Sequence, residues 1–208
     1  MKDLYIIGAG GCGREVLQWI KDSSIEYNII GFLDDNLKAL DDFKCSHKII
    51  SKISEYIPKA NDVFVCAIAN PDIKEKIMTS YMVKGAHFIN IVHPTSVIAE
   101  TAELGTGIVV YPYCVISDNT VIGDFVTLNL YDSIGHDAEI GDYTTISAHC
   151  DITGAVKIGK KVFMGTHVSI VPRVKIKDEA VLCAGSVVMN NISRGKKVLG
   201  NPAKKFEI

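Results

Sequence analysis

The chain has 208 residues, 48% of them hydrophobic, and a formal net charge of −2 from 22 basic and 24 acidic side chains. This length can hold two small domains with cores of their own, and the balanced charge offers no basic surface for nucleic acid. No apolar run approaches the length of a membrane-spanning helix, and the apolar run near the N-terminus is too short for a signal peptide. We therefore expect a cytoplasmic protein that neither binds nucleic acid nor inserts into a membrane.

The first 88 residues alternate short apolar runs with stretches of helical character, which predicts a parallel sheet with crossover helices. We expect this region, residues 1–88, to form an α/β Rossmann-like domain. The expected strands lie at 3–8, 27–35, 61–69 and 86–92, and the expected helices at 14–22, 51–57 and 71–85.

A glycine-rich turn separates the first expected strand from the first helix. Gly8, Gly10 and Gly13 match G-x-G-x-x-G, and Asp34 follows at the distance from Gly13 where an acid would contact a ribose. Such glycines let the backbone approach phosphates at a helix N-terminus. Taken alone, the motif suggests a dinucleotide dehydrogenase, but the domain is about half the usual size. We favour a smaller site for the diphosphate of a nucleotide-sugar; the alternative is a tight turn that binds nothing.

The second half of the chain carries an unbroken six-residue repeat of aliphatic side chains. Neither a helix nor an ordinary strand has this period, whereas three six-residue units close one triangular coil of a hexapeptide β-helix. We therefore expect residues 89–208 to form a parallel β-helix with an inward aliphatic ladder. The repeat comprises Val92, Ile98, Leu104, Val110, Ile116, Ile122, Leu128, Ile134, Ile140, Ile146, Ile152, Ile158, Met164, Ile170, Ile176, Leu182 and Val188.

A second inward position, four residues after each aliphatic residue, is mostly small or apolar. Ile108 and Asp132 depart from this rule in size and in charge. Cys114 and Cys150 occupy the position two coils apart, and the six cysteines contain no CxxC motif. We predict that these two are reduced core residues, as a cytoplasmic location allows.

The length of a coil, which is three hexads, also predicts which functional side chains lie next to one another. His136 and Gly154 are separated by one coil length and should therefore lie on one wall, on neighbouring coils. A histidine suits the removal of a proton from an acceptor, a neighbouring carboxylate such as Asp137 would orient the ring, and the Gly154 amide could stabilise an oxyanion. The alternatives are that His136 is only an exposed corner residue, or that an acid from elsewhere serves it.

The order of motifs along the whole chain resembles a known family. The glycine turn G-x-x-G-x-G (Gly8, Gly11, Gly13), then FLDD, AIANPDIKEKI, GHD and GNPAK, is similar to bacterial sugar O- and N-acyltransferases of the NeuD/PglD type. The resemblance implies a left-handed β-helix and a homotrimer with active sites between neighbouring prisms. It also implies acetyl-CoA-dependent acetylation of an amino or hydroxyl group on a nucleotide-linked sugar, in surface-polysaccharide or glycan synthesis, and no metal.

The resemblance also implies roles for individual residues. His136 would be the general base of a direct transfer, and Asp137 would orient it. The nucleotide-sugar would contact Gly8, Gly10, Gly11, Gly13, Asp34, Asp35, Asn70 and Asn129. Acetyl-CoA would contact Thr145, Gly154, Gly165, Ala184, Gly185 and Lys204.

Three positions depart from the family pattern. Cys12 and Thr145 replace histidines that several members carry, and Ala69 replaces the glycine of AIGN. The changes leave the reaction class intact but leave open which sugar is bound and whether nitrogen or oxygen is acetylated.

Two other function classes remain open from the sequence. His149 and His167 are also one coil length apart and should stack on one wall, and β-helices include zinc enzymes of the γ-carbonic anhydrase type. The close histidine pair of such a site is missing, and the glycine-loop domain would have no purpose in it. The other alternative is a scaffold that binds a nucleotide-sugar without turnover.

Overall fold

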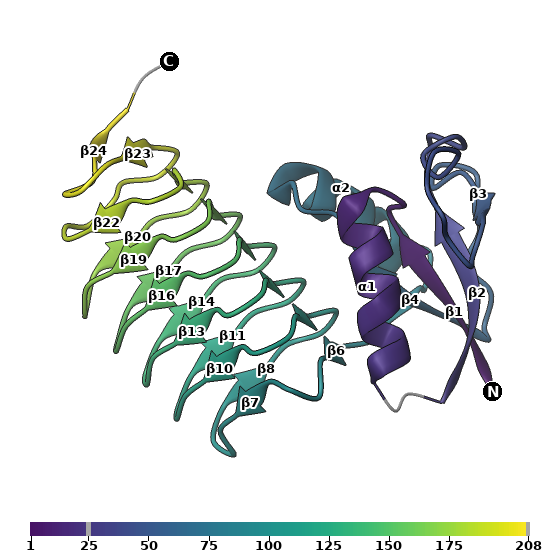
Figure 1. The fold of residues 1–208 in the computed structure, drawn as a ribbon, viewed down its shortest axis with the longest axis horizontal. Helices are drawn as coiled ribbons and strands as arrows, with labels where there is room; N and C mark the ends of the chain where they lie inside the picture. The colour runs from purple at the N-terminus through teal and green to yellow at the C-terminus, as the bar shows by residue number, and fades with distance from the viewer. Residues whose placement is uncertain (24–25, 207–208) are drawn as a thin grey trace.

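A computed structural model describes residues 1–23 and 26–206 of the chain. Figure 1 shows two parts, an N-terminal α/β domain and a long three-sided prism of stacked coils. The division between them at residues 88 and 89 stays a prediction.

The N-terminal domain is built on one five-stranded parallel sheet, in the order β3-β2-β1-β4-β5. Side chains of the central strands, such as Leu4, Ile6 and Val65, are fully buried because helices and loops cover both faces. The elements are β1 (Lys2–Ile7), α1 (Gly11–Asp22), β2 (Tyr27–Leu33), β3 (Ile49–Ser51), β4 (Asp62–Cys66), α2 (Pro71–Val83) and β5 (His87–Phe88).

Two of the expected elements in this domain are wrong. The helix expected at 51–57 does not form; β3 ends within this segment and turns follow it. So short a segment has little helical stability of its own, and here Ile53 packs into the core while Tyr56 bonds Asp62 at 2.8 Å. The single strand expected at 86–92 is divided, because β5 joins the α/β sheet and β6 joins the β-helix.

Residues 91–188 form the predicted left-handed parallel β-helix, with seventeen two-residue strands arranged in three walls. Wall 1 contains β6 (Ile91–Val92), β9 (Val109–Val110), β12 (Thr127–Leu128), β15 (Thr145–Ile146), β18 (Phe163–Met164) and β21 (Val181–Leu182), and is extended by β23 (Lys197–Leu199) and β24 (Lys204–Lys205). Wall 2 contains β7 (Val97–Ile98), β10 (Val115–Ile116), β13 (Ser133–Ile134), β16 (Asp151–Ile152), β19 (Ser169–Ile170) and β22 (Val187–Val188). Wall 3 contains β8 (Glu103–Leu104), β11 (Val121–Ile122), β14 (Glu139–Ile140), β17 (Lys157–Ile158) and β20 (Lys175–Ile176).

The register of the strands confirms the six-residue repeat. Each strand pairs in parallel with the strand three hexads further along the chain, as Ile116 does with Ile134 and Ile134 with Ile152. These aliphatic side chains point inward and are about 1% exposed. The fold class expected from the sequence is therefore confirmed.

Left-handed backbone conformation recurs at the corners of the prism. Every sixth residue from Tyr113 to Glu179 has a φ between 53° and 65°, although none of these residues is glycine. This conformation is strained for side chains with a Cβ atom. From Phe125 onward the amide of each such residue donates to a carbonyl in the preceding coil, as Asp137 does to Asp118 at 3.0 Å. The amides of Tyr113 and Asn119 donate instead to the hydroxyls of Thr95 and Thr101, at 3.0 Å and 2.8 Å. Hydrogen bonds between coils thus hold the corners in place.

The inward cysteines are confirmed as core residues. Cys114 and Cys150 are fully buried and free, and each Sγ donates to a backbone carbonyl, at 2.8 Å and 2.9 Å. Asp132 lies between them in the stack and accepts the amides of Asn129 at 2.8 Å and Cys150 at 2.9 Å. Burial raises the pKa of Asp132 to about 9.

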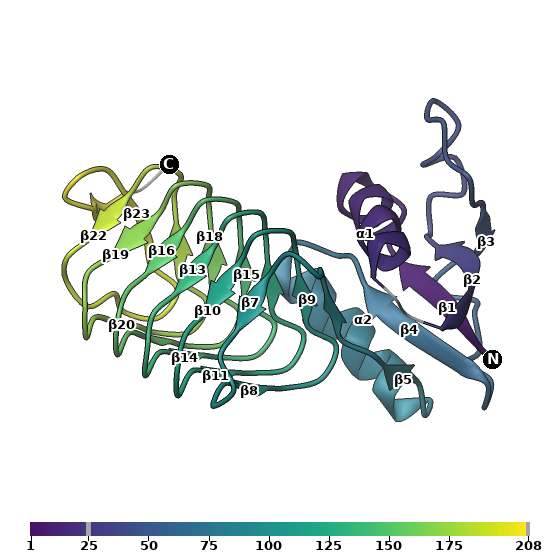
Figure 2. The same ribbon diagram turned by 60° about the horizontal axis from the view of Figure 1, so that its bottom comes forward.

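The N-terminal domain packs on the first coils of wall 1. The outward side chains of Val109, Thr127 and Thr145 are 1%, 6% and 4% exposed there. Figure 2 shows α2 lying between the α/β sheet and the prism, so this helix forms much of the contact. Within the described ranges, α1 and α2 lack the length and apolarity to span a bilayer.

Candidate active site

His136 and Asp137 project from the corner between wall 2 and wall 3. The imidazole Nδ1 lies 2.7 Å from Asp137 Oδ2, and the two side chains are 69% and 54% exposed. Because an ionised carboxylate only accepts hydrogen bonds, Nδ1 donates to Asp137 and the neutral form of the ring carries its lone pair on Nε2. The bond from His136 lowers the pKa of Asp137, so this acid stays ionised at neutral pH. The structure thus brings together the pair that the sequence only placed side by side.

Gly154 lies directly beneath this imidazole on the next coil. A Cβ atom added to Gly154 would sit 2.6 Å from His136 Nε2 and 2.7 Å from Cε1. The amide of Ala155 donates to the His136 carbonyl at 2.8 Å, which ties the two corners together. The absence of a side chain at residue 154 is therefore what leaves room for the ring in this position.

A shallow depression of about 440 Å³ lies on wall 2 next to this corner. Small polar side chains line it, and Ser133 Oγ donates to Asp151 Oδ1 at 2.7 Å. Ser133, Asp151 and Ser169 follow one another on successive coils of the outer face. The sequence did not predict these residues as part of the site. The available signal is that polar side chains recur once per coil at this outward position.

The glycines of the first turn divide into two pairs with different roles. Gly8 has a φ of +102°, and a Cβ atom on Gly13 would collide with the Gly8 carbonyl, so both are required by close packing of α1 on β1. A Cβ atom on Gly10 or Gly11 would meet nothing within 4 Å. A tight turn that binds nothing explains the first pair but not the second. The open pair lies at the N-terminus of α1, where amides can bind an anion.

Asp34 and Asp35 both make hydrogen bonds to backbone amides. Asp34 accepts the amide of Ala9 at 2.7 Å and that of Asn36 at 2.8 Å, so it braces the glycine turn. Asp35 accepts the amide and the hydroxyl of Ser54 at 3.0 Å and 2.9 Å. The first acid thus shapes the turn, while the second faces a cavity.

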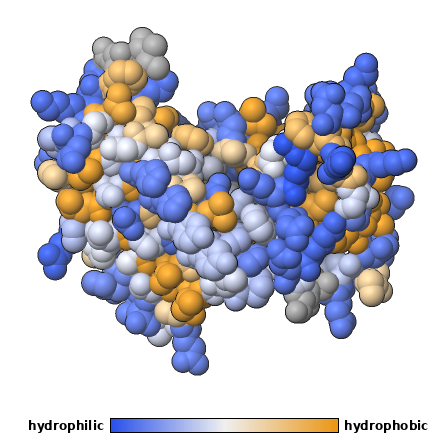
Figure 3. Space-filling view, viewed as in Figure 1, coloured by the Kyte–Doolittle hydropathy of each residue, from blue (hydrophilic) through white to orange (hydrophobic). Residues whose placement is uncertain are grey.

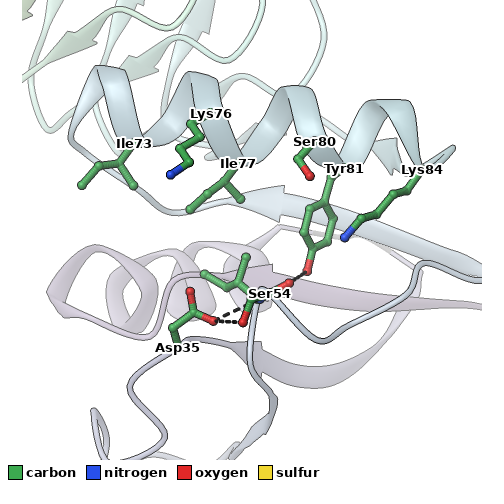
Figure 4. Close-up of a pocket in the computed structure, with 9 residues that line it drawn as sticks. Asp35, Ser54, Ile73, Lys76, Ile77, Ser80, Tyr81 and Lys84 are labelled. Carbon is green, nitrogen blue, oxygen red and sulfur yellow. Dashed lines mark hydrogen bonds between the residues drawn. The ribbon is translucent and has the colours of Figure 1, made fainter.

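That cavity, of about 500 Å³, lies between α2 and the loop that follows β3 (Figure 4). Ile53, Ile73, Ile77 and the ring of Tyr81 form its apolar part. Asp35, Ser54, Lys76, Ser80 and Lys84 supply charge and hydrogen-bonding groups. The sequence pointed only to Asp35. Lys76, Ser80 and Lys84 recur at every fourth position on one face of the helix, which was the signal for the rest.

Three expected site residues have partners inside the protein. Asn70 caps α2, accepting the amides of Asp72 and Ile73 at 3.1 Å and 3.0 Å. Asn129 accepts the Leu130 amide at 2.7 Å and lies at the corner between walls 1 and 2, on the opposite side of wall 2 from His136. Thr145 is buried and accepts a hydrogen bond from Lys74. The structure does not bring Asn129 or Thr145 to the imidazole of the same chain.

The remaining positions expected to contact coenzyme A lie near the C-terminal end of the prism. Gly165 and Ala184 are packed together, because a Cβ atom on Gly165 would lie 2.6 Å from the Ala184 amide nitrogen. Gly185 faces open space at the same corner, and Lys204 is exposed in β24. Their contact with coenzyme A stays a prediction.

His149 and His167 stack as the spacing predicted, with ring centroids 4.8 Å apart and 6° between planes. Tyr131 and Tyr113 continue the stack along the corner between walls 1 and 2. In the described ranges, no group of three or more His, Cys, Asp or Glu side chains is arranged to hold a metal ion. The ring stack accounts for this pair, and no observation favours the zinc-enzyme alternative.

Comparison with known proteins connects both parts to sugar acetyltransferases. Residues 3–81 match the PglD N-terminal domain family. The chain is 26% identical over 114 residues to UDP-N-acetylbacillosamine N-acetyltransferase of Bacillus subtilis (strain 168), covering 53% of this chain and 51% of that protein. It is 32% identical over 115 residues to GDP-perosamine N-acetyltransferase of Escherichia coli O157:H7, covering 52% and 51%. The matches thus span about half the length of these curated relatives.

Solved structures match nearly the whole chain. The acetyltransferase domain of PglB from Neisseria gonorrhoeae FA1090 in complex with acetyl coenzyme A has a TM-score of 0.89 and 25% identity, covering 99% of both chains. PerB from Caulobacter crescentus in complex with CoA and GDP-perosamine shares the fold, with a TM-score of 0.90 and 21% identity over 100% of this chain and 98% of that one. The resemblance to the NeuD/PglD type is therefore borne out over residues 3–81, which match the PglD N-terminal domain family, and the whole chain shares the fold of the PglB acetyltransferase domain.

Proposed function

We propose that the protein is an acetyl-CoA-dependent acetyltransferase that acts on an amino or hydroxyl group of a nucleotide-linked sugar. The observation that carries this proposal is the exposed His136–Asp137 pair above Gly154, on a β-helix joined to a domain whose Gly10 and Gly11 face open space at the N-terminus of α1. The names of the relatives support it, since both are sugar N-acetyltransferases. So does the acetyl coenzyme A bound to the Neisseria domain.

The proposed reaction is a direct transfer between the two substrates. The acceptor nitrogen or oxygen attacks the thioester carbonyl and gives its proton to His136 Nε2 as the new bond forms. Asp137 holds the opposite ring nitrogen and stabilises the imidazolium. The tetrahedral intermediate then expels the coenzyme A thiolate, which takes the proton from Nε2, so that the histidine ends neutral.

The corner next to His136 supplies the other needs of this reaction. The Gly154 amide is our candidate for the donor to the oxyanion, because its α-carbon lies beneath the imidazole. The hydroxyl-lined depression on wall 2 would hold polar groups of the substrates beside the base. With these two roles, the thioester carbonyl and the acceptor group would both lie close to His136 Nε2.

We place the nucleotide on the N-terminal domain. Its diphosphate would lie at Gly10 and Gly11, and its nucleoside in the cavity between α2 and the loop after β3. Asp34 and Asp35 connect these two places, since Asp34 bonds the glycine turn while Asp35 lines the cavity. Lys76 and Lys84 would add positive charge for a substrate that carries phosphates.

A homotrimer and a cytoplasmic location complete the proposal. Val97 and Val115 on wall 2 are 62% and 45% exposed, and the neighbouring corner residues Tyr113 and Tyr131 are 53% and 50% exposed. A second prism packed here would cover these side chains and lie beside the His136 corner. Figure 3 shows a face that is mainly hydrophilic, with apolar side chains in separate groups.

The proposed activity can be tested with purified protein, acetyl-CoA and a panel that includes GDP-perosamine and UDP-N-acetylbacillosamine. We expect release of free coenzyme A together with a sugar product heavier by one acetyl group. A thermal-shift screen of the same panel should show stabilisation by the accepted nucleotide-sugar. Nucleotide binding without any acetyl transfer would instead favour the scaffold alternative.

A further inference from the structure

Lys74 is a fully buried lysine with no part in the reaction described above. It lies in the first half of α2, and its side chain is 0% exposed. Lysines are almost never fully buried unless they are paired. The groups around Lys74 must therefore compensate for the burial of its ammonium group between the two parts of the molecule.

Among the residues that the structure describes, the ammonium group of Lys74 bonds only to the β-helix. Its Nζ donates to Thr145 Oγ1 at 2.7 Å, Thr127 Oγ1 at 3.0 Å, Phe125 O at 3.0 Å and Thr144 O at 3.5 Å. All four acceptors are neutral oxygens, and they belong to two consecutive coils of wall 1 and its adjoining corner. Burial lowers the pKa of Lys74 to about 8, although the nearby Cys66 and Cys12 thiols oppose this.

These hydrogen bonds orient α2 on wall 1 but add little to the free energy that holds the two parts together. Burying a cation without a carboxylate costs free energy, and an apolar side chain of similar size would avoid that cost. Hydrogen bonds to two coils, however, fix both the position and the rotation of α2 relative to wall 1. At the rim of the same contact Lys161 lies 3.0 Å from Glu75 and 3.2 Å from Asp72. These ion pairs are partly exposed and contribute little to the locking of α2.

The neighbouring face of α2 lines the nucleoside cavity. Ile73, Ile77 and Ser80 point toward that cavity in Figure 4, while Lys74, one residue after Ile73, reaches the β-helix. A rotation of α2 on wall 1 would thus move one side of the cavity relative to the prism that carries His136. The helix connects the proposed nucleotide site with the proposed transfer site.

We propose that Lys74 is a positioning residue that locks the nucleotide-binding domain onto wall 1 at the orientation in which the bound sugar reaches the histidine base. The inference rests on the proposed function for its catalytic consequence. Its structural part, the locking of α2 on the β-helix, stands on the contacts of Nζ alone.

The kinetic test uses the full-length Lys74→Met variant, which keeps the bulk of the side chain and removes its charge and donors. We expect kcat for acetyl transfer to fall at least about tenfold, because small misplacements of reacting groups are costly. The dissociation constants of coenzyme A and of UDP or GDP should stay within about twofold. The matched control is Glu75→Gln, which removes an exposed ion pair of the same helix and should change kcat less than about twofold.

Two further measurements separate this idea from simple loss of structure. Thr127→Val removes one acceptor and should lower kcat in the same direction, and its effect should largely vanish in the Lys74→Met background. Amide hydrogen exchange over 71–83 should be faster in Lys74→Met than in the native protein or Glu75→Gln. An unchanged kcat in Lys74→Met, or full additivity of the two substitutions, would overturn the positioning role.

The exchange measurement does not depend on the substrate. If the native protein transfers acetyl to no sugar in the panel, the proposed function fails, whereas unchanged exchange of α2 in Lys74→Met refutes the locking itself.

Discussion

At the scale of single residues, the site depends on the missing side chain of Gly154 as much as on the imidazole of His136. The imidazole of His136 occupies space that a side chain at residue 154 would fill. Since the atom in conflict is the far end of a flexible side chain, a substitution at Gly154 should displace the ring while leaving the fold intact. The histidine would then no longer hold its proton-accepting nitrogen at the same place.

We therefore predict that Gly154→Val lowers acetyl transfer at least about tenfold with little change in thermal stability. Steady-state kinetics and a melting curve on the same sample measure both quantities. Glu139→Gln on β14 removes an exposed ion pair with Lys157 and is the control. Native activity in Gly154→Val would show that the ring position seen here is not the one used.

At the scale of elements, the glycine turn makes a prediction that separates folding from binding. Gly13→Ala places a Cβ atom against the Gly8 carbonyl and should destabilise the domain, by a few kcal/mol at most. Gly11→Val points into open space, so it should preserve the melting temperature while blocking the phosphates from the α1 amides. Calorimetry with UDP or GDP should show weaker binding in Gly11→Val and unchanged coenzyme A binding. The opposite pattern would mean that the two ligand sites are exchanged.

The β-helix could be predicted strand by strand because its period is a property of the sequence itself. One aliphatic residue per hexad fixes the inward direction, and three hexads fix the coil, so the sequence alone places Gly154 one coil from His136 on the same wall. No comparable period governs the N-terminal domain. Its segment 51–57 has helical composition, yet contacts of Ile53 and Tyr56 with the core decide its conformation.

Contacts between the two parts were beyond the reach of sequence patterns. Thr145 and Lys74 are 71 residues apart, and neither carries a signal that they meet. Asn70 looked like a ligand residue in its motif, and in the structure it caps a helix. The cavity beside α2 was missed for the same reason, since it exists only where a helix of one segment faces a loop of another.

At the scale of the whole molecule, the buried lysine predicts how stability depends on pH. The Lys74 side chain has a pKa of about 8 in the folded protein against 10.5 for an ordinary lysine. Unfolding therefore takes up a proton between these values, and stability rises with pH through this window. The free energy of unfolding of the native protein, relative to Lys74→Met, should increase by roughly 3 kcal/mol at most from pH 8 to pH 10.5. Denaturant titrations at several pH values measure it, and a constant difference would contradict the burial of a charged amine.

Assembly is also a prediction at this scale. The proposed homotrimer should give a solution mass of three chains in light scattering, with or without ligands. A monomer that retains full acetyl transfer would show that each prism works alone, and would remove the role proposed for the exposed side chains of wall 2.

The central claim is that an exposed histidine on the β-helix corner is the base of an acetyl transfer. The measurement that tests it most directly is the rate of coenzyme A release by His136→Ala with saturating acetyl-CoA and the accepted nucleotide-sugar. We predict a loss of at least about 10²-fold, with unchanged melting temperature, solution mass and nucleotide binding. A variant that turns over at the native rate would contradict it.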